Sequence, residues 1–253
     1  MCVLNRIFVF FCLFSLAGMG LRAEAPVKQS GEGESDIGFL IGWLLEEGRD
    51  LEGLPFAEVI GHVSGHEVVV FDPENPVHVE TVAMLGTIFD GLIADLEDTE
   101  HPVHAVGRIN EVSGELEELL LKALEAEPGY RCGFPLTSEG EYQRSGYPDL
   151  ELVHEASGTV FYLDPKLYNA KSERSSFRTF YYEPKGETNK VNADAVHFIA
   201  GIRHRGRVGE RWDISGWKLI DLSGFEVKLK AEFQASNRDL YREEAVVAES
   251  GER

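Results

Sequence analysis

Apolar residues recur at helical spacing in three parts of the chain. The clearest is the stretch 109–126, where apolar positions fall three or four residues apart until Pro128-Gly129 ends the pattern. The same spacing appears after Asp36, which is suited to cap a helix of about 14 residues, and again from Val77 to Leu96. Each pattern predicts an amphipathic helix with one face buried in a core.

Short runs rich in β-branched and aromatic residues, bounded by turn residues, predict the strands of a sheet. These runs are 66–71, 130–134, 149–154, 159–163, 176–183, 195–202, 217–222 and 225–233. A final helix is expected to begin at Ser236. Helices that alternate with groups of strands predict an α/β fold with a mixed central sheet flanked by helices.

One predicted hairpin carries charged residues where its strands begin and end. Asp149 begins the first strand, and Asp164 ends the second strand two residues before Lys166. Side chains two residues apart on a strand lie on one face, so Asp164 and Lys166 should project together, with Asp149 beside them. Two carboxylates and a lysine suit a divalent cation and an anionic transition state. The alternative is a surface hairpin in which Lys166 only pairs with an acid.

The hairpin resembles a known nuclease signature. Pro148-Asp149, followed after fourteen residues by Asp164-Pro165-Lys166, resembles the PD-(D/E)XK motif of restriction-endonuclease-like nucleases. The resemblance implies a restriction-endonuclease-like fold and DNA cleavage that depends on Mg²⁺ or Mn²⁺. In this interpretation Asp149, Asp164 and the carbonyl of Pro165 hold the metal ion, and Lys166 activates water. Pro165 departs from the family pattern, which usually has an apolar residue with an N–H at that position.

The helix before the hairpin carries several glutamates. In the family that the chain resembles, a glutamate of this helix assists at the metal site, usually seven residues before a leucine, which corresponds here to Glu117 and Leu124. Glu111, Glu115 and Glu118 are rivals for that role. The alternative is that all four are solvated charges on the helix surface.

The charge of the chain is unevenly distributed. The 44 acidic residues outnumber the 24 lysines and arginines, and a net charge of −20 argues against a protein that coats nucleic acid by bulk charge. The segment 163–211 is an exception, with 10 basic and 6 acidic residues, and it predicts the DNA-facing surface. The candidate DNA contacts are Arg178, Lys185, Lys190, Arg203, Arg205 and Arg207. The alternative is that these charges only balance an acidic protein.

The N-terminus has the pattern of an export signal. Arg6 precedes an apolar run over 7–17, and Ala23 and Ala25 fit the small residues of a cleavage site. We therefore expect a secreted or periplasmic protein, with an uncleaved anchor or a misassigned start codon as alternatives. The expected divisions are a signal peptide (1–25), a polar linker (26–35), an N-terminal elaboration (36–105) and a nuclease-like core (106–253). No membrane segment is expected beyond the signal.

Two residues with reactive side chains are expected to be structural. Cys132 is the only cysteine after the leader, so neither an intrachain disulfide nor a cysteine zinc cluster is expected, and Cys132 should be buried. His197 lies inside an apolar run and is expected to be a hydrogen-bonded core residue.

Three functions fit these patterns. The first is a magnesium-dependent endonuclease that cleaves DNA, with RNA as an alternative substrate and a homodimer expected by analogy. The second is a catalytically inactive nuclease-fold protein that serves as a binding or structural module of the cell envelope. The third is a different metal-dependent hydrolase that uses the same acids.

Overall fold

The computed structural model describes residues 36–46, 51–176, 180–230 and 235–248. The chain divides into two units, Met1–Leu45 and Glu46–Arg253. Helix α1, Asp36–Glu46, begins in the first unit. The expected signal peptide and linker, 1–35, lie outside the described residues.

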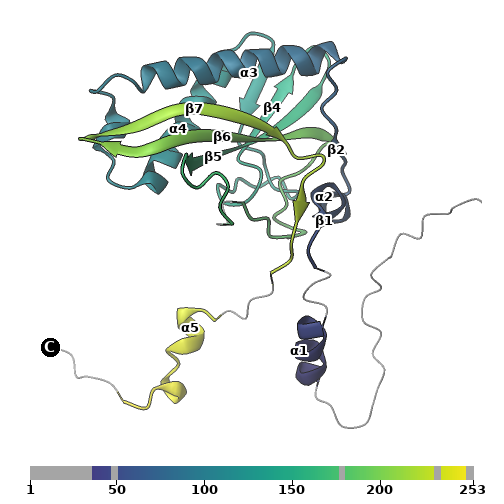
Figure 1. The fold of residues 1–253 in the computed structure, drawn as a ribbon. Helices are drawn as coiled ribbons and strands as arrows, with labels where there is room; N and C mark the ends of the chain where they lie inside the picture. Colours follow the sequence, from purple (N-terminus) through teal and green to yellow (C-terminus); the bar gives the residue numbers. More distant parts are fainter. Residues whose placement is uncertain (1–35, 47–50, 177–179, 231–234, 249–253) are drawn as a thin grey trace, which may run out of the picture. The chain divides into compact units, whose positions relative to one another are not determined.

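A six-stranded mixed sheet forms the centre of the second unit (Figure 1). The strands are β2 (Val68–Val69), β3 (Tyr130–Gly133), β4 (Leu150–His154), β5 (Thr159–Asn169), β6 (Ala195–Val208) and β7 (Arg211–Asp221). Their order is β2-β6-β5-β4-β3, and β7 also pairs with β6. β5 runs parallel to β6, whereas β4 and β7 run antiparallel to their neighbours. The expected α/β fold with a mixed central sheet is confirmed.

Two long helices cover one face of this sheet. They are α3, Pro76–Asp95, and α4, Ile109–Glu125. Leu85 and Phe89 of α3 share one hydrophobic cluster with Leu120 of α4 and with Phe161 and Phe198 of the strands. By length and composition α3 would be long and apolar enough to cross a membrane, but core helices of globular proteins share this property, and its apolar side chains pack on the sheet.

The opposite face of the sheet carries a second hydrophobic cluster. Phe56 and Ile60 of α2, Phe56–Ser64, pack there with Tyr162 of β5 and with Tyr147. Strands β1 (Leu54–Pro55) and β8 (Glu226–Val227) form a separate pair beside α2. The remaining short helices are η2 (Pro102–Ala105), α5 (Asn237–Leu240) and η3 (Glu243–Ala245).

Residues 54–105 are a part of the same fold as the predicted nuclease-like core. Strand β2 pairs with β6, and α3 packs in the cluster that α4 and the strands share. Over these residues the expected N-terminal elaboration therefore forms a layer of the fold. Its α3 side chains share one hydrophobic cluster with residues of the expected nuclease-like core, 106–253.

Several strands differ from the sequence-based expectation. β7 begins at Arg211, before the expected start at residue 217, and β8 covers only Glu226–Val227 of the expected strand at 225–233, whose last three residues lie outside the described part. The strand expected to end at residue 202 is longer, because β6 continues to Val208 and pairs with β7 around the turn Gly209-Glu210. β5 continues past Leu163 through Pro165, where β4 no longer pairs with it and the missing N–H of a proline is tolerated. The expected strand at 176–183 is absent from residue 176 and from residues 180–183, and residues 177–179 lie outside the described part.

Candidate active site

Strand pairing brings Asp149, Asp164 and Lys166 together. Asp164 and Lys166 alternate along β5 with Leu163 and Pro165, so the two charged side chains share the sheet face opposite α3 and α4. Asp149 immediately precedes β4, whose Leu150 pairs with Leu163. The Nζ atom of Lys166 lies 2.7 Å from Oδ2 of Asp164 and 3.2 Å from Oδ2 of Asp149. The expected convergence of these three residues is present in the structure.

Burial and mutual charge shift the pKa values of this group. The side chain of Asp164 is only 3% exposed, and burial, followed by the charge of Asp149, raises its pKa while Lys166 opposes the rise. Burial alone would lower the pKa of Lys166, but the two carboxylates outweigh burial and raise it. Lys166 is therefore an ammonium group at neutral pH, suited to stabilise negative charge.

The two carboxylates fit a hard divalent cation. Oδ2 of Asp164 is buried and forms an ion pair with Lys166. Within the described part of the chain, no contact of this oxygen has the geometry of a hydrogen bond. A buried carboxylate oxygen of this kind can be satisfied by a cation. In the described ranges no three His, Cys, Asp or Glu side chains form a metal-binding group. The structure brings together the carboxylates of Asp149 and Asp164, two of the three expected ligands, and the third, the carbonyl of Pro165, stays a prediction.

Glu117 is the α4 glutamate whose charge interacts with Asp149 and Lys166. Its side chain is 20% exposed, and burial, followed by the charge of Asp149, raises its pKa, against the lowering effect of Lys166 and Arg144. Its neighbour Glu118 is 42% exposed and pairs with Arg144 at 3.0 Å. Glu111 and Glu115, the other rivals, are exposed.

Sequence reasoning missed Arg144. It lies in the loop between β3 and β4, 3.0 Å from Glu118 and 4.0 Å from Glu117, with its guanidinium group over the ring of Phe134. Loop residues follow no hydrophobic period, so no pattern could have placed Arg144 beside α4.

A buried polar pair lies beneath the acids. Oη of Tyr147 lies 2.7 Å from Nδ1 of His197, and the two rings are stacked. Burial lowers the pKa of His197 to about 4, so the imidazole is neutral near pH 7. The prediction that His197 is a hydrogen-bonded core residue is confirmed, as is the burial of Cys132.

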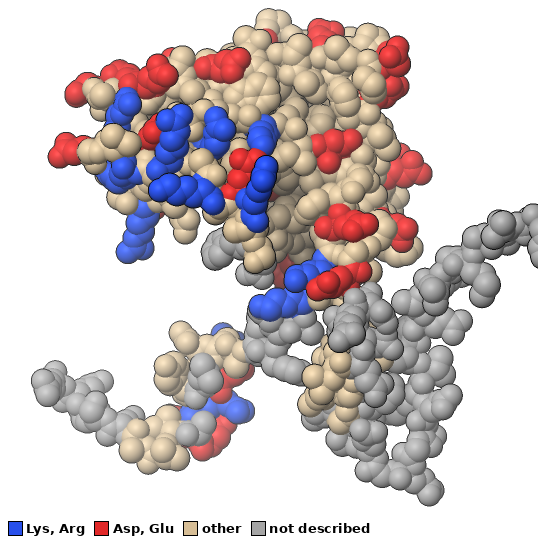
Figure 2. Space-filling model, in the orientation of Figure 1, with Lys and Arg blue, Asp and Glu red and all other residues tan. Residues whose placement is uncertain are grey.

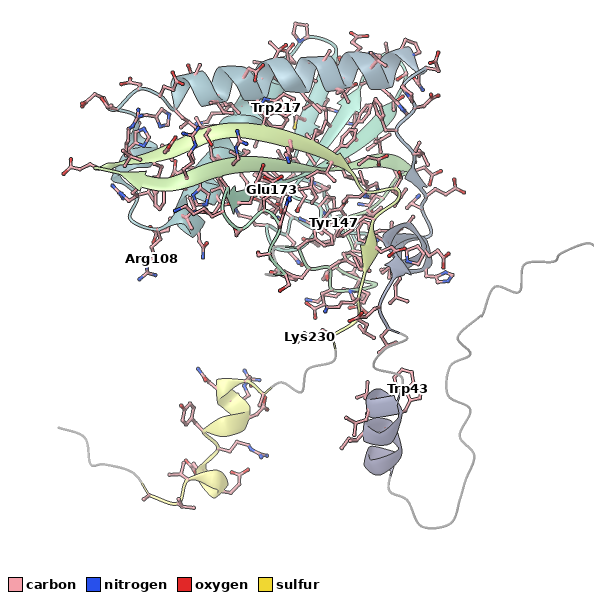
Figure 3. All side chains as sticks on the ribbon, viewed as in Figure 1. Trp43, Arg108, Tyr147, Glu173, Trp217 and Lys230 are labelled. Atoms are coloured by element: carbon pink, nitrogen blue, oxygen red, sulfur yellow. The ribbon has the colours of Figure 1, made fainter. Side chains whose placement is uncertain are left out.

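In Figure 3, Tyr147 lies on the side of the sheet away from α3, and Trp217 lies beside α3.

Comparison with known proteins identifies the family. Residues 50–244 match the model of the type II restriction enzyme MjaV family. The chain belongs to this family. A relative, the type II restriction enzyme MjaV of Methanocaldococcus jannaschii, is 30% identical over 211 residues, which cover 79% of this chain and 90% of the relative. The predicted likeness to restriction-endonuclease-like proteins is confirmed, and the matched MjaV region includes all the acids and lysines of the candidate site.

The expected DNA-facing residues of this MjaV-family chain lie in different parts of the fold. Arg203 and Arg205 lie on β6, and Arg203 shares the sheet face of Lys166 because Gly201 pairs with Lys166 and Tyr168 pairs with Arg203. Figure 2 shows lysines and arginines gathered over the β6–β7 ribbon. Lys185 is half exposed and pairs with Glu183. Arg178 lies outside the described residues.

Two of the expected DNA contacts are tied into the fold. Arg207 donates hydrogen bonds to the carbonyls of His104 and Val106, and its guanidinium group lies over the ring of Trp212. Lys190 is 1% exposed, so it is not the open surface lysine that its sequence neighbourhood suggested.

Proposed function

We propose that the protein is an endodeoxyribonuclease whose activity depends on Mg²⁺ or Mn²⁺. The observation that carries the proposal is the contact of Lys166 with both Asp149 and Asp164 on one face of β5, in a chain of a type II restriction enzyme family. The metal requirement rests on the chemistry of the paired carboxylates, one of which, Asp164, is almost fully buried beside the other.

Each residue of the site has a role in this proposal. Asp149, Asp164 and the carbonyl of Pro165 hold the divalent cation, which supplies positive charge against the phosphoryl oxygens. Lys166, held as an ammonium group by the two carboxylates, orients the attacking water and neutralises charge on the phosphate. Glu117, whose raised pKa reflects its burial and the charge of Asp149, accepts a hydrogen bond from a water at the edge of the site.

The DNA-facing surface extends from this site along β6. Arg203 and Arg205 are suited to contact phosphates, because they lie on the ribbon that leads away from Lys166 and because the rest of the chain is acidic. Lys185 and Arg178 are candidate phosphate contacts in the segment between β5 and β6. A homodimer would supply a second site for the second strand of a duplex, which sedimentation with and without DNA would reveal.

Cleavage of supercoiled plasmid with and without Mg²⁺ tests the function, with RNA as a parallel substrate. We expect Asp149→Asn and Asp164→Asn each to lose Mg²⁺ binding and cleavage. Lys166→Ala should keep Mg²⁺ affinity, because a competing cation is removed, and should cleave on the order of a hundredfold more slowly. Asp194→Asn is the matched control, since Asp194 is an exposed acid that pairs with His66.

Two outcomes would contradict the proposal. A Lys166→Ala variant that cleaves plasmid at the parental rate removes the lysine from the mechanism. A parent protein that cleaves neither DNA nor RNA with Mg²⁺ or Mn²⁺ would leave the inactive binding module as the better description, above all if the aspartate variants then melt at much lower temperature.

A further inference from the structure

Lys190 is a buried lysine in the irregular segment that connects β5 to β6. It is 1% exposed, whereas Lys185 in the same segment is half exposed. Lysine is almost never fully buried unless it has a partner. A buried lysine so close in sequence to the start of β6 therefore needs an explanation.

The backbone on both sides of Lys190 is fixed by hydrogen bonds. The carbonyl of Asn189 accepts a hydrogen bond from the N–H of Ser138, and the Asn189 side chain bonds both backbone groups of Val191. The N–H of Asn192 donates to Oη of Tyr162, and its side chain donates to the carbonyl of Leu136. These hydrogen bonds join the loop at residues 136–138 to the segment 189–192, and they fix the backbone that carries Lys190.

Lys190 lies on the sheet face that carries the acids, because the N–H of Asn192, two residues on, donates to Oη of Tyr162. The side chain of Tyr162 shares the β5 face of Asp164 and Lys166. Burial lowers the pKa of Lys190, and the charges of Asp149, Asp164 and Glu117, in that order, oppose this lowering. No described acid lies within ion-pair distance of Lys190, which distinguishes it from Lys166. The side chain of Lys190 is thus buried over most of its length, and its three N–H donors have no close carboxylate among the described residues.

The charge balance of the site explains why a second lysine is useful. Three carboxylates and two ammonium groups leave one unbalanced negative charge when all are ionised. One divalent cation converts that excess to one positive charge, which a single phosphodiester group balances. Without Lys190 the same site with its cation would carry no excess positive charge for the phosphate.

We propose that Lys190 is a second cation of the active site, which binds the scissile phosphodiester group together with Lys166. Its N–H groups find acceptors in the phosphate oxygens, and its charge stabilises the negative charge that develops there during cleavage. The inference rests on the proposed nuclease function, and it changes the role of Lys190 from a surface DNA contact to a residue at the reacting group.

The test compares Lys190→Met with Lys228→Met. Methionine keeps the length of the side chain and removes the charge, and Lys228 is an exposed lysine that pairs with Glu52. We expect Lys190→Met to cleave plasmid on the order of a hundredfold more slowly at saturating DNA and Mg²⁺. Its melting temperature should not fall, because a buried charge without a close partner is removed, and its Mg²⁺ affinity, measured by calorimetry without DNA, should not weaken. Lys228→Met should match the parent in all three measurements.

The outcomes separate this inference from the nuclease function. An active parent with an equally active Lys190→Met variant overturns the role of Lys190 alone, as does a rate loss that only follows a large drop in melting temperature. A parent without metal-dependent cleavage overturns the proposed function first. Should Lys190→Met fail to fold, Lys190→Gln, which keeps a polar end group, gives the same comparison of rates.

Discussion

Asp164 is held in a position where ionisation is costly without a cation. Its side chain is buried beside Asp149, and Lys166 offsets only part of the cost of its charge. In the folded protein without metal the carboxyl group therefore holds its proton to higher pH than in the unfolded chain, whose Asp pKa is about 4. Between these two pKa values the folded state binds more protons, and stability falls as pH rises.

This linkage predicts how Asp164→Asn changes stability. Asparagine cannot ionise, so relative to the parent the variant should gain up to about 1.4 kcal/mol in free energy of unfolding per pH unit above pH 4 in the presence of a chelator. The comparison with the parent cancels the opposite effect of His197, whose lowered pKa stabilises the fold as pH rises. Urea unfolding at several pH values measures the difference. An equal pH dependence in both proteins would show that the Asp164 pKa is not raised.

Single residues of the site differ in how far sequence could place them. Asp149, Asp164 and Lys166 were predictable because alternation along a strand and pairing across a hairpin determine which side chains meet. Arg144 and Lys190 come from loops that reach the site only through tertiary contacts. The sequence marked Lys190 only as a positive charge, because burial of a loop residue has no periodic signature.

The two faces of the β6–β7 ribbon differ in polarity. Ile202 and Trp212 bury one face in a cluster with Val112 and Leu116 of α4. The other face carries Arg203 near Gly216, whose backbone leaves room for the guanidinium group above it. The ribbon is thus an extension of the core on one face and a basic surface on the other.

This division predicts opposite effects for neighbouring arginines. Replacing Arg205 with Ala should weaken plasmid binding and reduce its salt dependence with little change in melting temperature, whereas Arg203→Ala should also lose the hydrogen bond that Arg203 donates to the carbonyl of Ser215. Arg207→Ala should lower the stability by about 0.5–1.5 kcal/mol, because the carbonyl of His104 loses the donor that Arg207 supplies, while the carbonyl of Val106 keeps only the N–H of Trp212. Gel-shift assays at several salt concentrations and thermal melting distinguish the two effects. Equal loss of DNA binding in stable Arg207→Ala protein would contradict the structural role.

Elements with a strong apolar period were predicted well, and polar extensions were not. The helix expected over 109–126 is α4, Ile109–Glu125, because the core selects its apolar stripe. The continuation of β6 beyond Ile202 alternates arginine and histidine, a pattern that resembles a loop. Only the pairing with β7 and its packing against η2 make these residues a strand.

At the scale of the whole molecule, the family match and the second unit nearly coincide. The match covers residues 50–244, and the second unit is Glu46–Arg253. The segment before residue 46 contributes none of the candidate site residues.

We therefore expect a chain that begins at Glu46 to fold and function alone. It retains Leu51, whose carbonyl accepts a hydrogen bond from Leu229, and every residue of the site. Its melting temperature and its rate of plasmid cleavage should equal those of the full chain. A truncated protein that folds but does not cleave would assign the first unit a part in the reaction.

The export signal remains a separate prediction about the same N-terminal segment. If residues 1–25 direct secretion, the mature protein in its native host should begin near Pro26 and lie outside the cytoplasm. N-terminal sequencing of protein from fractionated cells measures both. A cytoplasmic protein that begins at Met1 would instead favour a misassigned start codon or a leader without this function.

The pairing of β4 with β5 limits which insertions and deletions the gene of this protein can tolerate. The strands pair over five positions around the turn that follows His154, and Asp164 is reached directly after the last pair. Loss or gain of one codon between Thr159 and Leu163 would turn Asp164 and Lys166 towards α3 and α4 and place Leu163 and Pro165 in the site. Natural variants should therefore accumulate substitutions on the exposed positions of this hairpin, while length changes are confined to its turn.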